Sequence, residues 1–291
     1  MRRAPIIAAV FALLALAGCK REAAQTAHPA LWEVSGPSGA RAWVFGTVHA
    51  LPADLAWQSP AIDGALAASD TIVLEVAGVD DGPAARDAFL RLGTTPGQPP
   101  LADRVSPPLR EALRAAMART RLDPGQFANL EDWAAALTLS LAVESDEGYD
   151  NANGADKALL AKAGKRPVVG LETIEGQLGV FDALPAPAQR ALLDSVVAET
   201  TDKQESARLI KAWSDGDMAA MDREAHGGML ADERLRGPLL VQRNRAWAAA
   251  VERMMREGHR PFVAVGAAHV AGIDGLPALL GARGFTVNRV Q

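Results

Sequence analysis

Two stretches decide the fold: Trp43-Val44-Phe45-Gly46-Thr47-Val48-His49 and Phe262-Val263-Ala264-Val265-Gly266-Ala267-Ala268-His269. Each is an apolar, β-favouring run that ends in Gly-x-x-His, which predicts a buried strand with a histidine just beyond its C-terminal end. Open α/β sheets place their chemistry at the carboxyl ends of their strands. Imidazole is well suited to bind a metal ion or to move protons near neutral pH. We therefore expect His49 and His269 to share one site.

The segments around these two runs predict an α/β protein. Further strands are expected at residues 31–35, 70–76, 166–172 and 285–290, with helices at 60–69, 103–121, 130–144, 153–163 and much of 173–257. The strand-helix-strand unit from 40 to 76 should be right-handed and parallel. The sequence thus predicts a central mixed, mostly parallel sheet built from both chain ends. The middle of the chain, roughly 93–150 and 174–257, should form a helical cap.

The N-terminus has the pattern of a bacterial lipoprotein signal. Arg2 and Arg3 precede an apolar segment at residues 6–17, which ends in Leu16-Ala17-Gly18-Cys19. That segment is too short to span a membrane comfortably. The chain has one cysteine, so an intrachain disulfide is excluded and acylation is the role expected for Cys19. An ordinary secretory signal with an incidental cysteine is the alternative.

This pattern divides the chain into three parts. Residues 1–18 would be the signal peptide, 19–29 a polar tether, and 30–291 the folded domain, anchored to a bacterial membrane and facing the periplasm. A net charge of −5 and the lack of a basic patch argue against a nucleic-acid partner. Gly-x-Ser-x-Gly, His-Glu-x-x-His and the phosphate-binding Gly-x-x-x-x-Gly-Lys-Ser/Thr motif are all missing from the sequence.

Two carboxylates accompany the paired histidines. Glu75 and Glu172 each lie at the end of a predicted buried strand, so a parallel sheet would bring His49, Glu75, Glu172 and His269 to one edge. Two imidazoles with one or two carboxylates form a ligand set for Zn, Mn, Fe or Co. Such an ion lowers the pKa of bound water to about 7 and polarises a carbonyl group.

Each of these residues also has an ordinary structural explanation. Either glutamate could cap a turn or pair with a surface arginine. Asp156 begins a helix, where it would complement the helix dipole. Arg243 lies on a helix, where charged side chains usually face solvent. Single histidines are mostly surface groups, as we expect for those outside the two motifs.

The motifs together resemble those of the TraB/PrgY/GumN family, especially its GumN-like bacterial branch. The resemblance runs from about residue 31 to 291 and rests on segments found in the family's order. They are Leu31-Trp32-Glu33-Val34, Phe45-Gly46-Thr47-Val48-His49, Ile72-Val73-Leu74-Glu75, Gly154-Ala155-Asp156, Gly170-Leu171-Glu172-Thr173 with Gln177, Arg243-Asn244 with Trp247, and Val265-Gly266-Ala267-Ala268-His269. Gly154-Ala155-Asp156 departs mildly from the family's usual Gly-Val/Met-Asp.

The resemblance implies an activity. The family shares two Gly-x-x-His motifs, a glutamate and an arginine with the Tiki proteins, which are extracellular metal-dependent proteases that favour manganese or cobalt. It is also related to erythromycin-esterase-like and haem-binding ChaN-like proteins with a similar α/β core. By this resemblance His49 and His269 are the paired histidines, Glu75 the strand-end glutamate and Arg243 the helix arginine.

We therefore expect a lipid-anchored, metal-dependent hydrolase of peptides or related small molecules. His49, His269 and one or both of Glu75 and Glu172, with Glu75 the first choice, would hold Mn, Co or Zn. The remaining carboxylate would serve as general base. Arg243 would neutralise an oxyanion or a substrate carboxylate. The alternatives are a degenerate scaffold and a non-enzymatic haem-binding or peptide-binding lipoprotein. Haem binding is disfavoured because the single tyrosine, Tyr149, lies in an acidic stretch.

Overall fold

A computed structural model describes residues 26–78, 82–149, 151–202 and 204–291. Cys19, the predicted signal peptide and most of the tether lie outside these described residues. The described strands form one six-stranded sheet in the order β4-β3-β5-β2-β1-β6. Their bounds are β1 Leu31–Ser35, β2 Arg41–Thr47, β3 Thr71–Val76, β4 Val168–Glu172, β5 Pro261–Gly266 and β6 Thr286–Arg289.

The sheet is mixed and mostly parallel, which confirms the predicted α/β fold class. β4, β3, β5 and β2 run parallel, β1 is antiparallel to β2, and β6 is antiparallel to β1. β5 comes from the C-terminal part of the chain and lies between β2 and β3. The crossover from β2 through α1 (Pro60–Ala68) to β3 therefore skips one strand position. Both chain ends build the sheet, as the sequence predicted.

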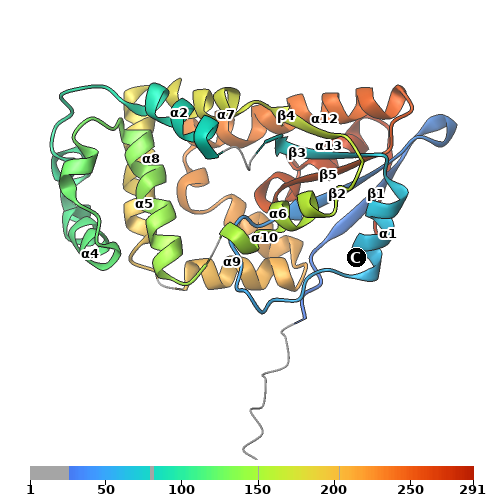
Figure 1. Cartoon of the computed structure of the whole chain (residues 1–291), viewed down its shortest axis with the longest axis horizontal. Coiled ribbons are helices and arrows are strands. Elements are labelled where there is room, and N and C mark those ends of the chain that lie inside the picture. The colour runs from blue at the N-terminus through green and yellow to red at the C-terminus, as the bar shows by residue number, and fades with distance from the viewer. Residues whose placement is uncertain (1–25, 79–81, 150, 203) are drawn as a thin grey trace, which may run out of the picture.

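Helices cover both faces of the sheet (Figure 1). One face packs against α1, α6 (Ala155–Ala161), α9 (Glu205–Ser214) and α10 (Met218–Ala225), and the other against α12 (Gln242–Arg256) and α13 (Leu276–Ala282). Side chains alternate between the two faces because successive residues of a strand point in opposite directions. In β5, Phe262 and Ala264 join the first core, whereas Val263 and Val265 join the second.

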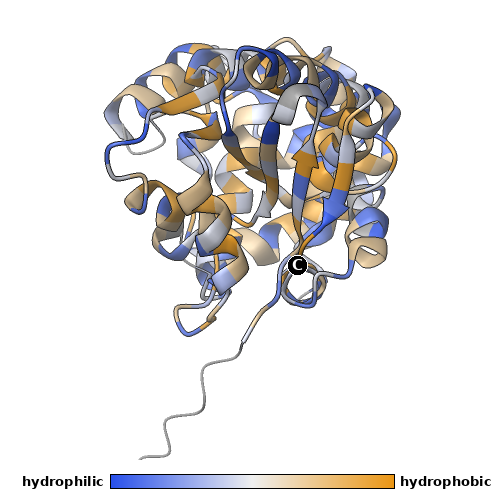
Figure 2. Ribbon diagram, turned by 90° about the vertical axis from the view of Figure 1, so that its right-hand side faces the viewer, coloured by the Kyte–Doolittle hydropathy of each residue, from blue (hydrophilic) through white to orange (hydrophobic). Residues whose placement is uncertain are grey.

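A third core lies beside the sheet and is built mainly from helices. It is formed mainly by α3 (Leu101–Arg104), α4 (Arg110–Thr120), α5 (Asp132–Asp146), α8 (Ala186–Glu199) and α11 (Glu233–Arg236). α2 (Gly82–Gly93) packs on α7 (Ile174–Asp182) at its edge. α2 precedes the segments predicted as the cap, and α9, α10 and α12 of the later segment pack directly on the sheet. Figure 2 shows hydrophobic and hydrophilic residues interspersed along the helices and strands.

The helix predicted at residues 103–121 is broken in the structure. α3 ends at Arg104, a 3-10 turn follows at Pro107–Leu109, and α4 begins at Arg110. The break arises because neither of the two successive prolines has a backbone N–H to donate, and because the first of them disfavours helical backbone at Ser106, whose ψ is 139°. Among the residues with assigned structure, no helix is long and apolar enough to cross a bilayer.

Candidate functional site

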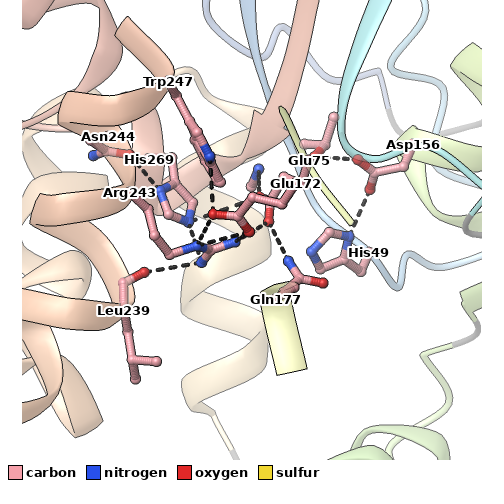
Figure 3. Close-up of polar contacts among 12 residues, drawn as sticks. His49, Glu75, Asp156, Glu172, Gln177, Leu239, Arg243, Asn244, Trp247 and His269 are labelled. Atoms are coloured by element: carbon pink, nitrogen blue, oxygen red, sulfur yellow. Dashed lines mark hydrogen bonds and ion pairs between the residues drawn. The ribbon is translucent and has the colours of Figure 1, made fainter. Parts of the chain in front are cut away.

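The two Gly-x-x-His motifs leave the sheet side by side. β2 and β5 are adjacent and parallel, and His49 lies two residues beyond the end of β2. His269 lies in the 3-10 turn Ala267–Val270 that directly follows β5. β3 pairs with the other side of β5 and carries Glu75. The structure thus brings His49, Glu75 and His269 together at the carboxyl ends of three parallel strands (Figure 3).

Gly266 lies at the centre of these three side chains. A Cβ atom built on Gly266 would lie 3.1 Å from Oε1 of Glu75, 3.7 Å from Cδ2 of His269 and 3.9 Å from Nε2 of His49. The Gly266 N–H donates a hydrogen bond of 2.7 Å to Oε1 of Glu75. The missing side chain therefore leaves open the space around which the two rings and the carboxylate are arranged.

His269 is held in one neutral tautomer. Nδ2 of Asn244 donates to the Asp274 carbonyl oxygen at 2.8 Å, which turns Oδ1 of Asn244 toward Nδ1 of His269 at 2.5 Å. Nδ1 must therefore carry the proton, so Nε2 presents a lone pair. Burial lowers the pKa of His269 to about 4, with the charge of Arg243 acting in the same direction and that of Glu75 opposing it. The ring is therefore neutral at pH 7.

His49 is bonded to a carboxylate through its other ring nitrogen. Nδ1 lies 2.7 Å from Oδ2 of Asp156, and Oδ1 of Asp156 accepts a 2.8 Å bond from Oγ1 of Thr47. Partial burial lowers the pKa of His49, but the hydrogen bond and charge of Asp156 and the charge of Glu75 outweigh it and raise the pKa. Because 64% of the side-chain surface is exposed, water screens these charges. Asp156 thus orients the ring and leaves Nε2 on the side of Gly266.

Glu75 is a buried carboxylate with several donors. Its Oε2 accepts from Nε2 of Gln177 at 2.9 Å and from Nη2 of Arg243 at 3.0 Å, while Oε1 accepts from Gly266. Burial raises the pKa of Glu75, but the charges of Arg243 and His49 and the Gly266 N–H outweigh burial and hold it below its ordinary value. Glu75 is therefore ionised at neutral pH.

The Arg243 guanidinium has no free N–H. Nε donates to Glu172, Nη1 to the Leu239 carbonyl oxygen and to Nε2 of His269, and Nη2 to Glu75 and Glu172, at distances of 2.9 to 3.3 Å. These contacts use all five donors of the group. Only 10% of the side-chain surface is exposed. An oxyanion could bind Arg243 only if one of these contacts were released.

Glu172 faces Arg243 rather than open space. Besides Arg243, its Oε1 accepts from Nε1 of Trp247 at 3.1 Å. The indole ring of Trp247 in turn lies 4.5 Å below the guanidinium carbon of Arg243 and 4.4 Å from the ring of His269. Glu172 therefore positions Arg243, and Glu75 is the strand carboxylate that faces the histidines.

A cavity of about 390 Å³ opens over this cluster. His49, Glu75, Arg243 and His269 all line it, and Glu172 does not. Tyr149 also lines it, because the chain beyond α5 returns over the carboxyl ends of the strands. Its volume lies in the range of small-molecule pockets, which is about 300–1,000 Å³.

The donor set matches the chemistry of a divalent metal ion. Each histidine is fixed through Nδ1 by a carboxylate or amide oxygen, which is how metal-binding rings are usually held, and leaves Nε2 for the ion. Nε2 of His269 is 3.9 Å from Oε1 of Glu75. In the described ranges, however, no group of three or more His, Cys, Asp or Glu side chains is preassembled around an ion position. Arg243 Nη1, at 3.3 Å from Nε2 of His269, would have to yield to an ion.

Sequence reasoning missed the supporting residues. Asp156, Gln177, Asn244 and Trp247 all occur in the motifs that carry the family resemblance, but none was assigned to the site. Asp156 does lie in the first turn of α6, where a role at the helix dipole explained it fully. Glu144 lines the cavity from α5 without any motif to mark it.

Replacing Gly266 with alanine tests whether the open space at Gly266 matters. The φ of Gly266 is −49°, which alanine adopts without strain, so Gly266→Ala should fold and lose only a few degrees in Tm. The methyl group would press on Glu75 Oε1, and we expect any activity of the site to fall at least about tenfold because small misplacements of reacting groups are costly. Gly64→Ala on α1, with nothing within 4 Å of its Cβ, is the control. Full activity in Gly266→Ala would contradict the assigned geometry.

Comparison with known proteins agrees with the motif pattern. The model of the TraB/PrgY/gumN family matches residues 30–289, which include every strand of the sheet and every residue of the cluster. No match to this chain was found among curated proteins or among solved structures. The family match covers nearly the whole chain, with the Gly-x-x-His strands adjacent at its centre. The chain belongs to the TraB/PrgY/gumN family.

Proposed function

We propose that this protein is a metal-dependent hydrolase of peptides whose centre is His49, Glu75 and His269. One observation carries the proposal: both rings are fixed through Nδ1 and present Nε2 beside an ionised carboxylate, around the bare backbone of Gly266. A bound Mn, Co or Zn ion would supply water with a pKa near 7 and polarise the scissile carbonyl. The GumN-like branch and the kinship with Tiki proteases, both suggested by the motifs, point the same way.

In this proposal the chain's own groups position the reactants. Asp156 and Asn244 fix the two rings, and Arg243, held by Glu172, fixes Glu75. In the reaction, the oxygen of water bonds to the acyl carbon and the C–N bond breaks. The departing nitrogen must receive the proton that water loses.

Glu144 is the residue that we assign to carry this proton. It lines the cavity opposite the sheet end and accepts a 3.1 Å hydrogen bond from Oγ of Ser140. Burial raises the pKa of Glu144, although the bond from Ser140 and the charge of His49 oppose this. A carboxyl group with a raised pKa can both accept and return a proton near neutral pH.

We expect Glu144→Gln to lower kcat about 10²-fold, a typical loss for general acid–base catalysis, because the amide cannot transfer the proton. Metal content should be unchanged, since Glu144 is not a ligand in this proposal. Steady-state kinetics and metal analysis test this prediction. Glu147→Gln, one helical turn away, is the matched variant. Unaltered kcat would remove Glu144 from the mechanism.

The experiment that tests the proposed function is hydrolysis of a broad peptide library. Protein purified without chelator should cleave members of the library, lose this activity with chelator, and regain it with Mn, Co or Zn. His49→Ala should be inactive under all conditions, and His259→Ala, which changes an exposed histidine after α12, should behave as wild type. A library left intact by wild type with each metal would reject the hydrolase proposal.

A binding protein is the second candidate, and one observation favours it. The acidic stretch around Tyr149 disfavoured haem binding in the sequence analysis, but Tyr149 lines the cavity together with Met221 and Met229. Tyrosine and methionine are both haem ligands in other proteins. A Soret shift on haem titration that is lost in Tyr149→Phe, without hydrolysis of any peptide, would favour this function.

We also propose that Cys19 anchors the protein to the membrane on its periplasmic side. An attached acyl chain contributes about 0.8 kcal/mol per buried CH₂, so its loss should abolish membrane association. We expect Cys19→Ser to move the protein from the detergent phase to the aqueous phase in a phase-partition experiment. Retention of the variant in the detergent phase would contradict the anchor.

A further inference from the structure

The cavity over the cluster has two unlike sides. His49, Glu75, Gly266 and His269 come from the strand ends and are polar. The rest of the lining comes mainly from helices and is mostly apolar. Six of its large apolar residues are here called the apolar wall: Phe181, Leu209, Ile210, Met229, Leu230 and Leu240.

The apolar wall is assembled from elements far apart in the sequence. Phe181 lies on α7, Leu209 and Ile210 on α9, and Met229 and Leu230 in the 3-10 turn Gly228–Ala231. All five of these side chains are only partly buried, although they pack against the hydrophobic cores. They therefore keep apolar surface that water covers in the free protein. An apolar guest that displaced this water would gain hydrophobic free energy.

The charges of the site oppose an anionic guest at the wall. Glu75 and Glu144 both line the cavity, and the one arginine in the lining, Arg243, has every N–H engaged. A carboxylate side chain placed beside Glu75 and Glu144 would be repelled by both and would find no free N–H on Arg243. An apolar side chain has no comparable desolvation cost. The apolar surface and the two carboxylates beside it favour the same kind of guest, an uncharged apolar side chain.

We propose that the apolar wall is a specificity pocket for an apolar side chain next to the scissile bond of the substrate. This inference rests on the proposed hydrolase function. It assigns substrate choice to Leu209, Ile210, Met229 and Leu230, and it predicts leucine or phenylalanine in preference to alanine or glutamate. Methionine at the wall gives it the adaptability to accept more than one apolar shape.

The first test uses wild type and a set of capped peptides that differ only at the residue before the scissile bond: alanine, leucine, phenylalanine or glutamate. We expect kcat/KM for leucine and phenylalanine to exceed that for alanine at least about tenfold, the effect typical of added apolar groups in a hydrophobic pocket. Binding of the same peptides, measured by calorimetry with chelator present, should follow the same order. Equal or reversed order in both measurements would overturn the inference.

The second test changes the wall. Leu230→Asn should reduce the preference for leucine over alanine at least about fivefold, with little change for alanine itself. Leu141→Asn alters a leucine that is 54% exposed on α5 and outside the lining, so its preference should be that of wild type. Circular dichroism establishes that both variants are folded. A folded Leu230→Asn with undiminished preference contradicts the proposal.

The two readouts separate this inference from the proposed function. Cleavage without side-chain preference would reject the pocket and leave the hydrolase proposal standing. Tighter binding of leucine and phenylalanine peptides without any cleavage would support the pocket and reject the hydrolase.

Discussion

His49→Ala and His269→Ala should each abolish divalent metal binding and hydrolysis, and the double variant should be no worse than either single one. The reason is geometric. Both rings and the Glu75 carboxylate lie within 4 Å of the Cβ position of Gly266, and Nε2 of His269 is 3.9 Å from Oε1 of Glu75. The proposed site therefore has three protein ligands, and the loss of any one leaves too few to hold the ion. Effects of residues that act as one unit do not add.

Metal affinity by calorimetry and steady-state rates on one cleaved peptide measure this prediction. Asp156→Asn and Asn244→Ala should weaken metal binding by about 10- to 100-fold rather than abolish it, because these residues orient the rings without being ligands themselves. His259→Ala serves as the control. Independent, additive losses in His49→Ala and His269→Ala would instead indicate two separate sites.

Arg243→Lys should lower kcat by about 10²- to 10³-fold, the loss typical of removing one electrostatic donor from a catalytic site. Lysine keeps the charge but not the fork, so it cannot reach Glu75, Glu172 and the Leu239 carbonyl at once. Glu75 would then lose the contact that fixes its position. Because Arg243→Lys keeps a cation, its free energy of unfolding should fall only moderately. Arg243→Met would leave Glu75 and Glu172 without their cation and should cost about 3–5 kcal/mol of stability.

Kinetics and thermal melting of Arg243→Lys separate a positioning role from a purely structural one. A structural residue would lower Tm and leave kcat of the folded fraction unchanged. Arg245→Lys, on the exposed side of the same helix, should change neither quantity. Wild-type kcat in Arg243→Lys would show that the guanidinium fork plays no part in the reaction.

Local sequence pattern was enough to place the strands that build the site. Each of β2, β3 and β5 is a short apolar run with a polar group at or just beyond its end, and parallel strands bring such ends together. The same reasoning treated Glu75 and Glu172 alike. They differ because β3 lies next to β5 at the centre, whereas β4 lies at the sheet edge, where α12 supplies Arg243 and Trp247 as partners.

Partners from distant elements could not be predicted from local pattern. Asn244 meets His269, and Gln177 meets Glu75, only because helices α12 and α7 pack over the strand ends. Arg243 was expected to face solvent or substrate. Its N–H groups instead bond to five acceptor atoms, which come from four separate elements. The break at Pro107 is the opposite case, since its cause is local. The Ala/Leu/Arg periodicity outweighed the two prolines in the prediction, and the backbone followed the prolines.

The most direct test of the central claim is a crystal of the protein grown with Mn²⁺ and measured for anomalous scattering at the manganese edge. The account predicts one strong peak about 2.0–2.3 Å from Nε2 of His49, Nε2 of His269 and a carboxylate oxygen of Glu75, with Arg243 Nη1 moved away from His269. Saturating Mn²⁺ that leaves no peak between the two histidines, with Arg243 still bonded to His269, would contradict it.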